Sequence, residues 1–151
     1  KDAEVTTGLP VFGFSSSAIF GDQLWANIQF ALNEATGSVC LVPVSAPSSR
    51  ICATELGEAI VRSDGSACIE SVGEEVCRPV VSESGRTVVY QCEPLACGVG
   101  TIYCAHGASA TIVCAKLWED SRVALGETVR ELALAGANVV GIALIDRFYG
   151  E

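Results

Sequence analysis

The chain has 151 residues, half of them apolar, and a formal net charge of −9. This length and apolar content suffice for one domain, residues 1–151, with a buried core. Only nine Lys and Arg stand against 18 acidic residues, and this balance argues against a nucleic-acid backbone or an anionic membrane as a partner.

The first predicted elements are a strand, a helix and a second strand. Residues 9–14 are typical of a strand, and apolar residues at helical spacing predict an amphipathic helix from about 22 to 35. Residues 39–44 predict the next strand, in which Pro43 indicates an edge position or a bulge.

The middle of the chain predicts a helix over residues 49–62, followed by short hairpin-like strands between Gly-containing turns. These strands are expected at 67–72, 76–81, 87–92 and 101–105. No long polar tract separates this middle part from the ends, so a second domain is not expected.

The last elements repeat the arrangement of the first. Residues 110–115 and 139–145 predict strands, and the helix between them would begin at Ser121 and end at Gly136. Its buried face would hold Leu125, Val129 and Leu132. Two terminal β-α-β units predict an α+β fold, a ferredoxin-like α/β sandwich with a cysteine-rich hairpin region in its middle.

Eight cysteines lie between residues 40 and 114, and their even number predicts disulfides. They are Cys40, Cys52, Cys68, Cys77, Cys92, Cys97, Cys104 and Cys114. Disulfides persist in oxidising compartments, and a chain without methionine that starts at Lys1 is typical of a processed form, so a secreted, extracellular protein is expected. Eight cysteines allow 105 pairings, so the connectivity stays open.

A metal site is not predicted, because no Cys-x-x-Cys pair supplies closely spaced ligands. The only histidine, His106, follows Cys104 closely and could complete a Cys3His site, but no second short-spaced pair accompanies it. The sequence also has no phosphate-binding loop and no dinucleotide fingerprint, so no cofactor is predicted.

Catalytic signals are weak. A small secreted hydrolase could use His106 as a base with Ser109 and acidic partners. The three serines at 15–17 lack the closing glycine of a Gly-x-Ser-x-Gly elbow, so they predict a loop before the first helix.

Surface features offer alternatives based on recognition. Acidic residues in the middle of the chain could form a solvated face or dock a basic partner: Glu70, Glu74, Glu75, Glu83 and Glu93. A loop from Glu93 to Gly100 could enter a protease cleft as an inhibitor, and Phe148 and Tyr149 could anchor an oligomer. The apolar stretch 132–145 is too short to span a bilayer as a helix, so membrane insertion is not expected.

The start without methionine, the eight cysteines and the terminal β-α-β units ending at Val44 and Ile145 resemble small secreted fungal proteins of the killer-toxin and plant-pathogen effector type. This resemblance implies a non-enzymatic protein that acts on a protein partner or cell-surface target of a host or competitor. The sequence therefore predicts a secreted recognition protein, with the protease inhibitor and the His106 hydrolase as alternatives.

Overall fold

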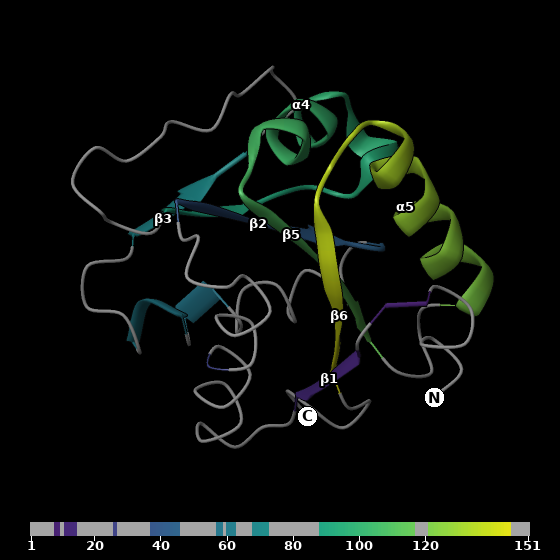
Figure 1. The fold of residues 1–151 in the computed structure, drawn as a ribbon, viewed down its shortest axis with the longest axis horizontal. Helices are drawn as coiled ribbons and strands as arrows, with labels where there is room; N and C mark the ends of the chain where they lie inside the picture. The colour runs from purple at the N-terminus through teal and green to yellow at the C-terminus, as the bar shows by residue number, and fades with distance from the viewer. Residues whose placement is uncertain are drawn as a thin grey trace.

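The described residues form one sheet of six parallel strands in the order β1-β6-β5-β2-β4-β3 (Figure 1). The computed structural model describes residues 8–9, 11–14, 26, 37–45, 57–58, 60–62, 68–72, 88–116 and 121–145. The strands are β1 (Val11–Phe14), β2 (Ser38–Pro43), β3 (Cys68–Ser71), β4 (Val88–Gln91), β5 (Ala110–Lys116) and β6 (Val139–Ile145).

The all-parallel sheet corrects the prediction of a ferredoxin-like, disulfide-stabilised sandwich, because that fold requires antiparallel neighbours. Every residue of β2 is buried, and so are residues 110–115 of β5. Strands buried on both faces have continuous apolar runs instead of an alternating pattern, and parallel sheets covered by helices produce this burial. The apolar runs in the sequence were therefore a signal for a parallel sheet.

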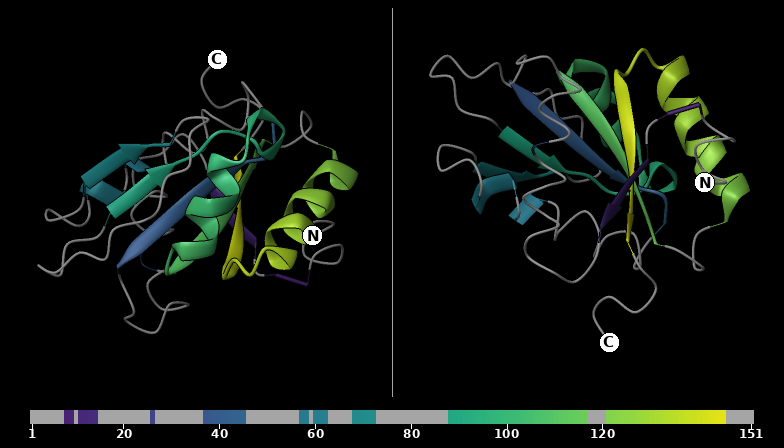
Figure 2. Two further views of the ribbon diagram at one scale, coloured as in Figure 1. Left: turned by 90° about the horizontal axis from the view of Figure 1, so that it is seen from above. Right: turned by 60° about the horizontal axis from the view of Figure 1, so that its bottom comes forward.

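Two helices cover one face of the sheet. The helices α4 (Gly100–Gly107) and α5 (Arg122–Leu134) lie side by side on the same side of the strands (Figures 1 and 2). Both belong to right-handed crossovers that step in the same direction, from β4 to β5 and from β5 to β6. The core on this face includes Cys40, Tyr90 and Val113.

Helical residues 57–58 and 60–62 cover the opposite face, below the sheet in Figure 1. Gly57 lies against the side chain of Gln91 in β4, where an added Cβ would meet Nε2 at 2.6 Å. Tyr90, the residue before Gln91 in β4, belongs to the core on the face that α4 covers. Because successive side chains of a strand point to opposite faces, the Gln91 side chain points to the other face of the sheet. Ile60, within the helix predicted over 49–62, is helical and fully buried.

The prediction of hairpins in the middle of the chain is wrong for the strands that the structure describes. β3 and β4 pair in parallel, so the chain crosses over between them instead of turning back. The stretch predicted as a strand at 101–105 lies inside α4. Thr101, Cys104 and Ala105 have helical spacing and are buried together, and this packing outweighs the β-propensity of the neighbouring residues.

The predicted ends of α5 are confirmed. The Ser121 side chain accepts a hydrogen bond of 3.0 Å from the backbone N–H of Ala124. At the other end Gly136 has a φ of +82°, and the N–H of Ala137 donates to the carbonyl of Leu132 at 3.0 Å. Leu125 and Leu132 are buried, as the periodicity predicted.

Pro43 is the last residue of β2, in the middle of the sheet, so the predicted edge position is wrong. The strand tolerates proline there because β2 pairs with β4 only as far as Leu41, while its pairing with β5 extends to Pro43. Pro43 lies beyond the part of β2 that pairs with β4, so this pairing needs no hydrogen bond from the nitrogen of Pro43.

Hydrogen bonds between side chains and backbone hold the amino edge of the sheet. Ser38 N–H donates to Oγ of Ser109 at 3.2 Å, and Ser109 N–H donates to Oγ of Ser38 at 2.9 Å. Asn138 donates from Nδ2 to the Ser109 carbonyl at 2.9 Å, and its own carbonyl accepts from the N–H of Thr111 at 2.8 Å. Because these bonds join the starts of β2, β5 and β6, they fix the mutual register of the three strands.

Several predicted elements lie wholly or partly outside the described residues. In the predicted helix 22–35 the structure describes only Ala26, which is helical, and the strand at 76–81 is not described. Neither α4 nor α5, the two longest helices in the described part of the chain, has the length and apolar character needed to cross a bilayer.

Candidate functional site

The carboxyl edge of the sheet contains one topological switch point, between β2 and β5. The chain leaves β2 towards β3 on one side and leaves β5 towards β6 on the other. Right-handed crossovers in opposite directions place their helices on opposite faces, so the connections separate above the ends of these two strands. Crevices of this kind are the usual ligand sites of open parallel sheets.

A backbone hydrogen bond joins the two strands at this switch point. The N–H of Val44 donates to the Cys114 carbonyl at 3.0 Å, which keeps the chain against β5 just after β2 ends. Ser45 follows, half-buried, and Lys116 is the last residue of β5. Lys116 is also one of only two lysines in the chain.

A second candidate site is a cluster of three thiols between the sheet and α4. Cys40 lies in β2, Cys92 follows the last residue of β4, and Cys104 lies in α4. Their sulfur atoms all lie within 4.8 Å of one another, and the sulfurs of Cys40 and Cys92 are 3.1 Å apart. All three side chains are buried.

The three thiols change one another's protonation. Hydrogen bonds from Cys40 and Cys92 lower the pKa of Cys104 far below the usual range of a thiol, although burial acts in the opposite direction. Hydrogen bonds to Cys104 and Cys92, with burial, raise the pKa of Cys40 well above that range. The cluster therefore favours one thiolate, on Cys104, held by two thiol donors.

The predicted disulfides are not found among the described cysteines. No bond joins any two of Cys40, Cys68, Cys92, Cys97, Cys104 and Cys114. A disulfide needs its sulfurs about 2.05 Å apart, and the 3.1 Å between Cys40 and Cys92 is the distance of a hydrogen-bonded contact. Cys52 and Cys77 lie outside the described residues.

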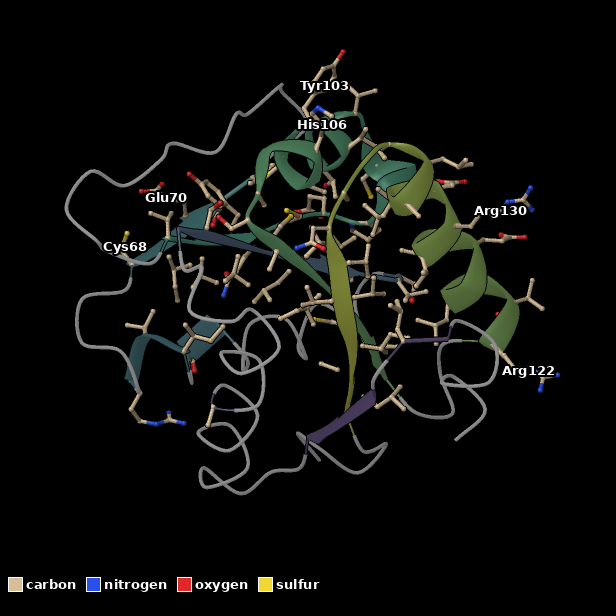
Figure 3. The ribbon with its side chains drawn as sticks, in the orientation of Figure 1. Cys68, Glu70, Tyr103, His106, Arg122 and Arg130 are labelled. Atoms are coloured by element: carbon tan, nitrogen blue, oxygen red, sulfur yellow. The ribbon has the colours of Figure 1, made fainter. Side chains whose placement is uncertain are left out.

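His106 and Ser109, the proposed base and its neighbour, have structural partners at the amino side of the sheet. Nδ1 of His106 donates to the Ala135 carbonyl at 2.7 Å, at the C-terminal end of α5. Oγ of Ser109 accepts from the N–H of Ser38. His106 is exposed near Tyr103 on α4 (Figure 3) and is not part of the thiol cluster.

The segment Glu93–Gly100, proposed as an inhibitory loop, is ordered against the body of the protein. It contains the 3-10 helix η1 (Leu95–Cys97) and enters α4. The hydroxyl of Thr101 donates to the Glu93 carbonyl at 2.7 Å, and Pro94 is buried. Of the predicted acidic patch, Glu70 is exposed on β3 (Figure 3) and Glu93 is half-buried, while Glu74, Glu75 and Glu83 lie outside the described residues.

Comparisons with known proteins show the fold. No family model matches the sequence, and no curated protein matches it. Among solved structures, the chimerical protein CapA2B2 matches with a TM-score of 0.74 and 10% identity over 98% of both chains. The kinase domain of Escherichia coli tyrosine kinase ETK matches with a TM-score of 0.71 and 10% identity, over 90% of this chain and 78% of that domain.

These neighbours correct the predicted resemblance to fungal killer toxins and effectors. The chain has an α/β fold shared with a kinase domain, and its described cysteines form no disulfide framework. The prediction of a non-enzymatic, disulfide-braced toxin or effector is therefore wrong. Its two alternatives lose their structural basis, because His106 and Ser109 are bound to backbone groups and the segment Glu93–Gly100 is hydrogen-bonded to α4.

The sequence did not predict either candidate site. The switch point depends on strand order, which the hydrophobic pattern of single strands does not contain. The thiol cluster joins residues 12 to 64 positions apart, so no short spacing marked it. A usable signal was the position of Cys40 within a fully apolar run, because a structural disulfide at the centre of a buried parallel strand would be unusual.

Proposed function

We propose that the chain is a nucleotide-binding domain of phosphoryl-transfer type, with its site at the carboxyl edge between β2 and β5. The observation that carries the proposal is the similarity of fold to the ETK kinase domain over 90% of this chain. The switch point adds support, because parallel α/β sheets bind nucleotides at such crevices.

Composition determines what form of nucleotide the site would take. The chain carries a net charge of −9 and has no Gly-x-x-x-x-Gly-Lys-Ser/Thr loop to neutralise phosphates. A nucleoside triphosphate would therefore bind as its magnesium complex, since the metal neutralises part of the phosphate charge. Lys116, the last residue of β5, places a basic residue at this edge of the sheet.

The test is a titration of the full chain with MgATP, followed by calorimetry, together with an assay for transfer of the γ-phosphoryl group to the chain itself. We expect saturable binding that requires magnesium. Ser45→Trp places a large ring just after β2 and should weaken binding roughly 10-fold or more, a loss of about 1.4 kcal/mol.

The matched control is Ala96→Trp, which adds the same ring at an exposed residue of η1. This variant should bind MgATP like the unmodified chain. If the folded chain shows no binding at millimolar MgATP, the proposal is wrong. If both tryptophan variants bind equally well, the site does not lie at the switch point.

A further inference from the structure

We propose that Cys40, Cys92 and Cys104 bind one soft divalent cation of the zinc class through three thiolates. The site lies between the sheet and α4 and is independent of nucleotide binding at the carboxyl edge. The ligands come from β2, from the residue after β4 and from α4, so the fold, not a sequence motif, brings the three sulfurs together.

The distances fit a metal site after a small adjustment. Zinc lies about 2.3 Å from thiolate sulfur, and tetrahedral geometry then places two sulfurs about 3.8 Å apart. The three sulfurs lie within 4.8 Å of one another, and those of Cys40 and Cys92 are 3.1 Å apart. A widening of about 0.7 Å between the sulfurs of Cys40 and Cys92 would bring that pair to the separation found on one face of a tetrahedral zinc site.

The number of thiols distinguishes a metal from a disulfide. A disulfide between Cys40 and Cys92 would leave Cys104 as a buried thiol without a reacting partner in the cluster. Three converging sulfurs instead match the ligand number of a site that keeps one position for water or another oxygen. Soft thiolates select zinc-class ions over magnesium or calcium, which prefer oxygen ligands.

Burial and charge favour a divalent ion. Cys40 and Cys104 have no exposed surface, and Cys92 is 5% exposed. Three thiolates with a divalent ion leave a net charge of −1, whereas a monovalent ion would leave −2 in the same apolar surroundings. A smaller buried charge costs less desolvation free energy.

A buried hydroxyl next to the cluster gives independent support. Thr111 is the register neighbour of Cys40 in β5, and its side chain shares the face of the sheet that α4 covers. Its Oγ1 is fully buried and has no hydrogen-bond partner within the described part of the chain. A buried hydroxyl without a hydrogen-bond partner lowers the free energy of unfolding by about 1–3 kcal/mol. A metal-bound water or thiolate would give this hydroxyl a partner.

The test uses the full chain, reduced and kept under argon, titrated with Co²⁺ and then with Zn²⁺. We expect one Co²⁺ per chain, with a thiolate-to-cobalt charge-transfer band and the intense visible bands of tetrahedral cobalt. Zinc should displace the cobalt and raise the melting temperature, because the bound ion ties α4 to β2 and to the end of β4.

Cys40→Ser and Cys104→Ser should each weaken zinc binding about 100-fold or more, since each removes a thiolate ligand. The control is Cys97→Ser, which removes an exposed thiol of η1 and should bind zinc normally. Circular dichroism checks that each variant folds, and the cobalt spectrum of the unmodified chain decides the question if a variant does not.

Three outcomes would overturn the proposal. The folded, reduced chain could take up no cobalt or zinc at micromolar concentration. The Cys97→Ser variant could lose binding as fully as the cluster variants. Mass spectrometry of the unreduced chain could find Cys40 joined to Cys92 in a disulfide in protein that carries no metal.

Discussion

At Gly136 the backbone adopts a conformation that other residues avoid, and a neighbouring side chain closes the space around it. The φ there is +82°, and an added Cβ would lie 3.1 Å from Nδ1 of His106. That nitrogen also donates to the Ala135 carbonyl, so the ring cannot turn away without losing a hydrogen bond. His106, the only histidine of the chain, therefore joins the end of α4 to the end of α5 through this hydrogen bond.

Gly136→Ala should lower the free energy of unfolding by about 1–2 kcal/mol, because a Cβ strains the left-handed conformation and crowds His106. Urea denaturation measures the change. Gly126→Ala, inside α5, provides the matched control and should raise the free energy of unfolding by about 0.5–1 kcal/mol through helix propensity. Equal stability of Gly136→Ala and the unmodified chain would contradict the structural role of this junction.

The lowered pKa of Cys104 has a measurable pH dependence in the metal-free chain. The native pKa lies below that of the unfolded thiol, about 8.5, so the thiolate contributes stability above the unfolded value and this contribution is lost as pH falls through the native pKa. Thiolate absorbance in the ultraviolet should persist at neutral pH and disappear in Cys104→Ser. A titration of the unmodified chain with a single midpoint near pH 8.5 would contradict this prediction.

At the scale of elements, α5 shows how far local signals in the sequence extend. Its N-cap, its buried leucines and its closing glycine were all predicted, because each depends on residues within one or two helical turns. Most of α4 was predicted as a strand, since its mean apolar character is high and its buried face consists of Gly100, Thr101, Cys104 and Ala105. Packing against β2 decides that segment, and a single sequence does not contain this contact.

Ser121→Ala should lower the free energy of unfolding by about 1 kcal/mol, because it leaves the N–H of Ala124 without its side-chain acceptor. Guanidinium denaturation followed by helical circular dichroism measures this loss. Ser121→Asp keeps an acceptor and adds a negative charge at the helix N-terminus, so it should retain full stability. Equal destabilisation by both variants would show that the cap does not stabilise α5.

At the scale of the whole molecule, most strand positions were predicted from the sequence, but their arrangement was not. Residues 39–44, 110–115 and 139–145 coincide with β2, β5 and β6 to within one residue at each end. Their order and direction depend on contacts between distant parts of the chain, and the eight cysteines favoured a stapled hairpin fold instead. The cysteine count was interpreted as disulfides, and the six described cysteines form none. Secretion, which rested partly on those disulfides, stays a prediction.

Pro43 contributes no atom to the thiol cluster, yet it determines where the cluster forms. In the parallel ladder of β2 and β4, the Leu41 carbonyl accepts from the N–H of Cys92 at 3.0 Å. The next bond would run from the nitrogen of Pro43 to the Cys92 carbonyl, and proline has no hydrogen to donate. The chain therefore leaves the sheet at Cys92 and enters the segment that leads to α4. Pro43 lies two residues beyond Leu41, the last residue of β2 that pairs with β4, and it ends the pairing of these two strands there. The end of the pairing sets where the chain leaves β4, and with it the position of the Cys92 sulfur.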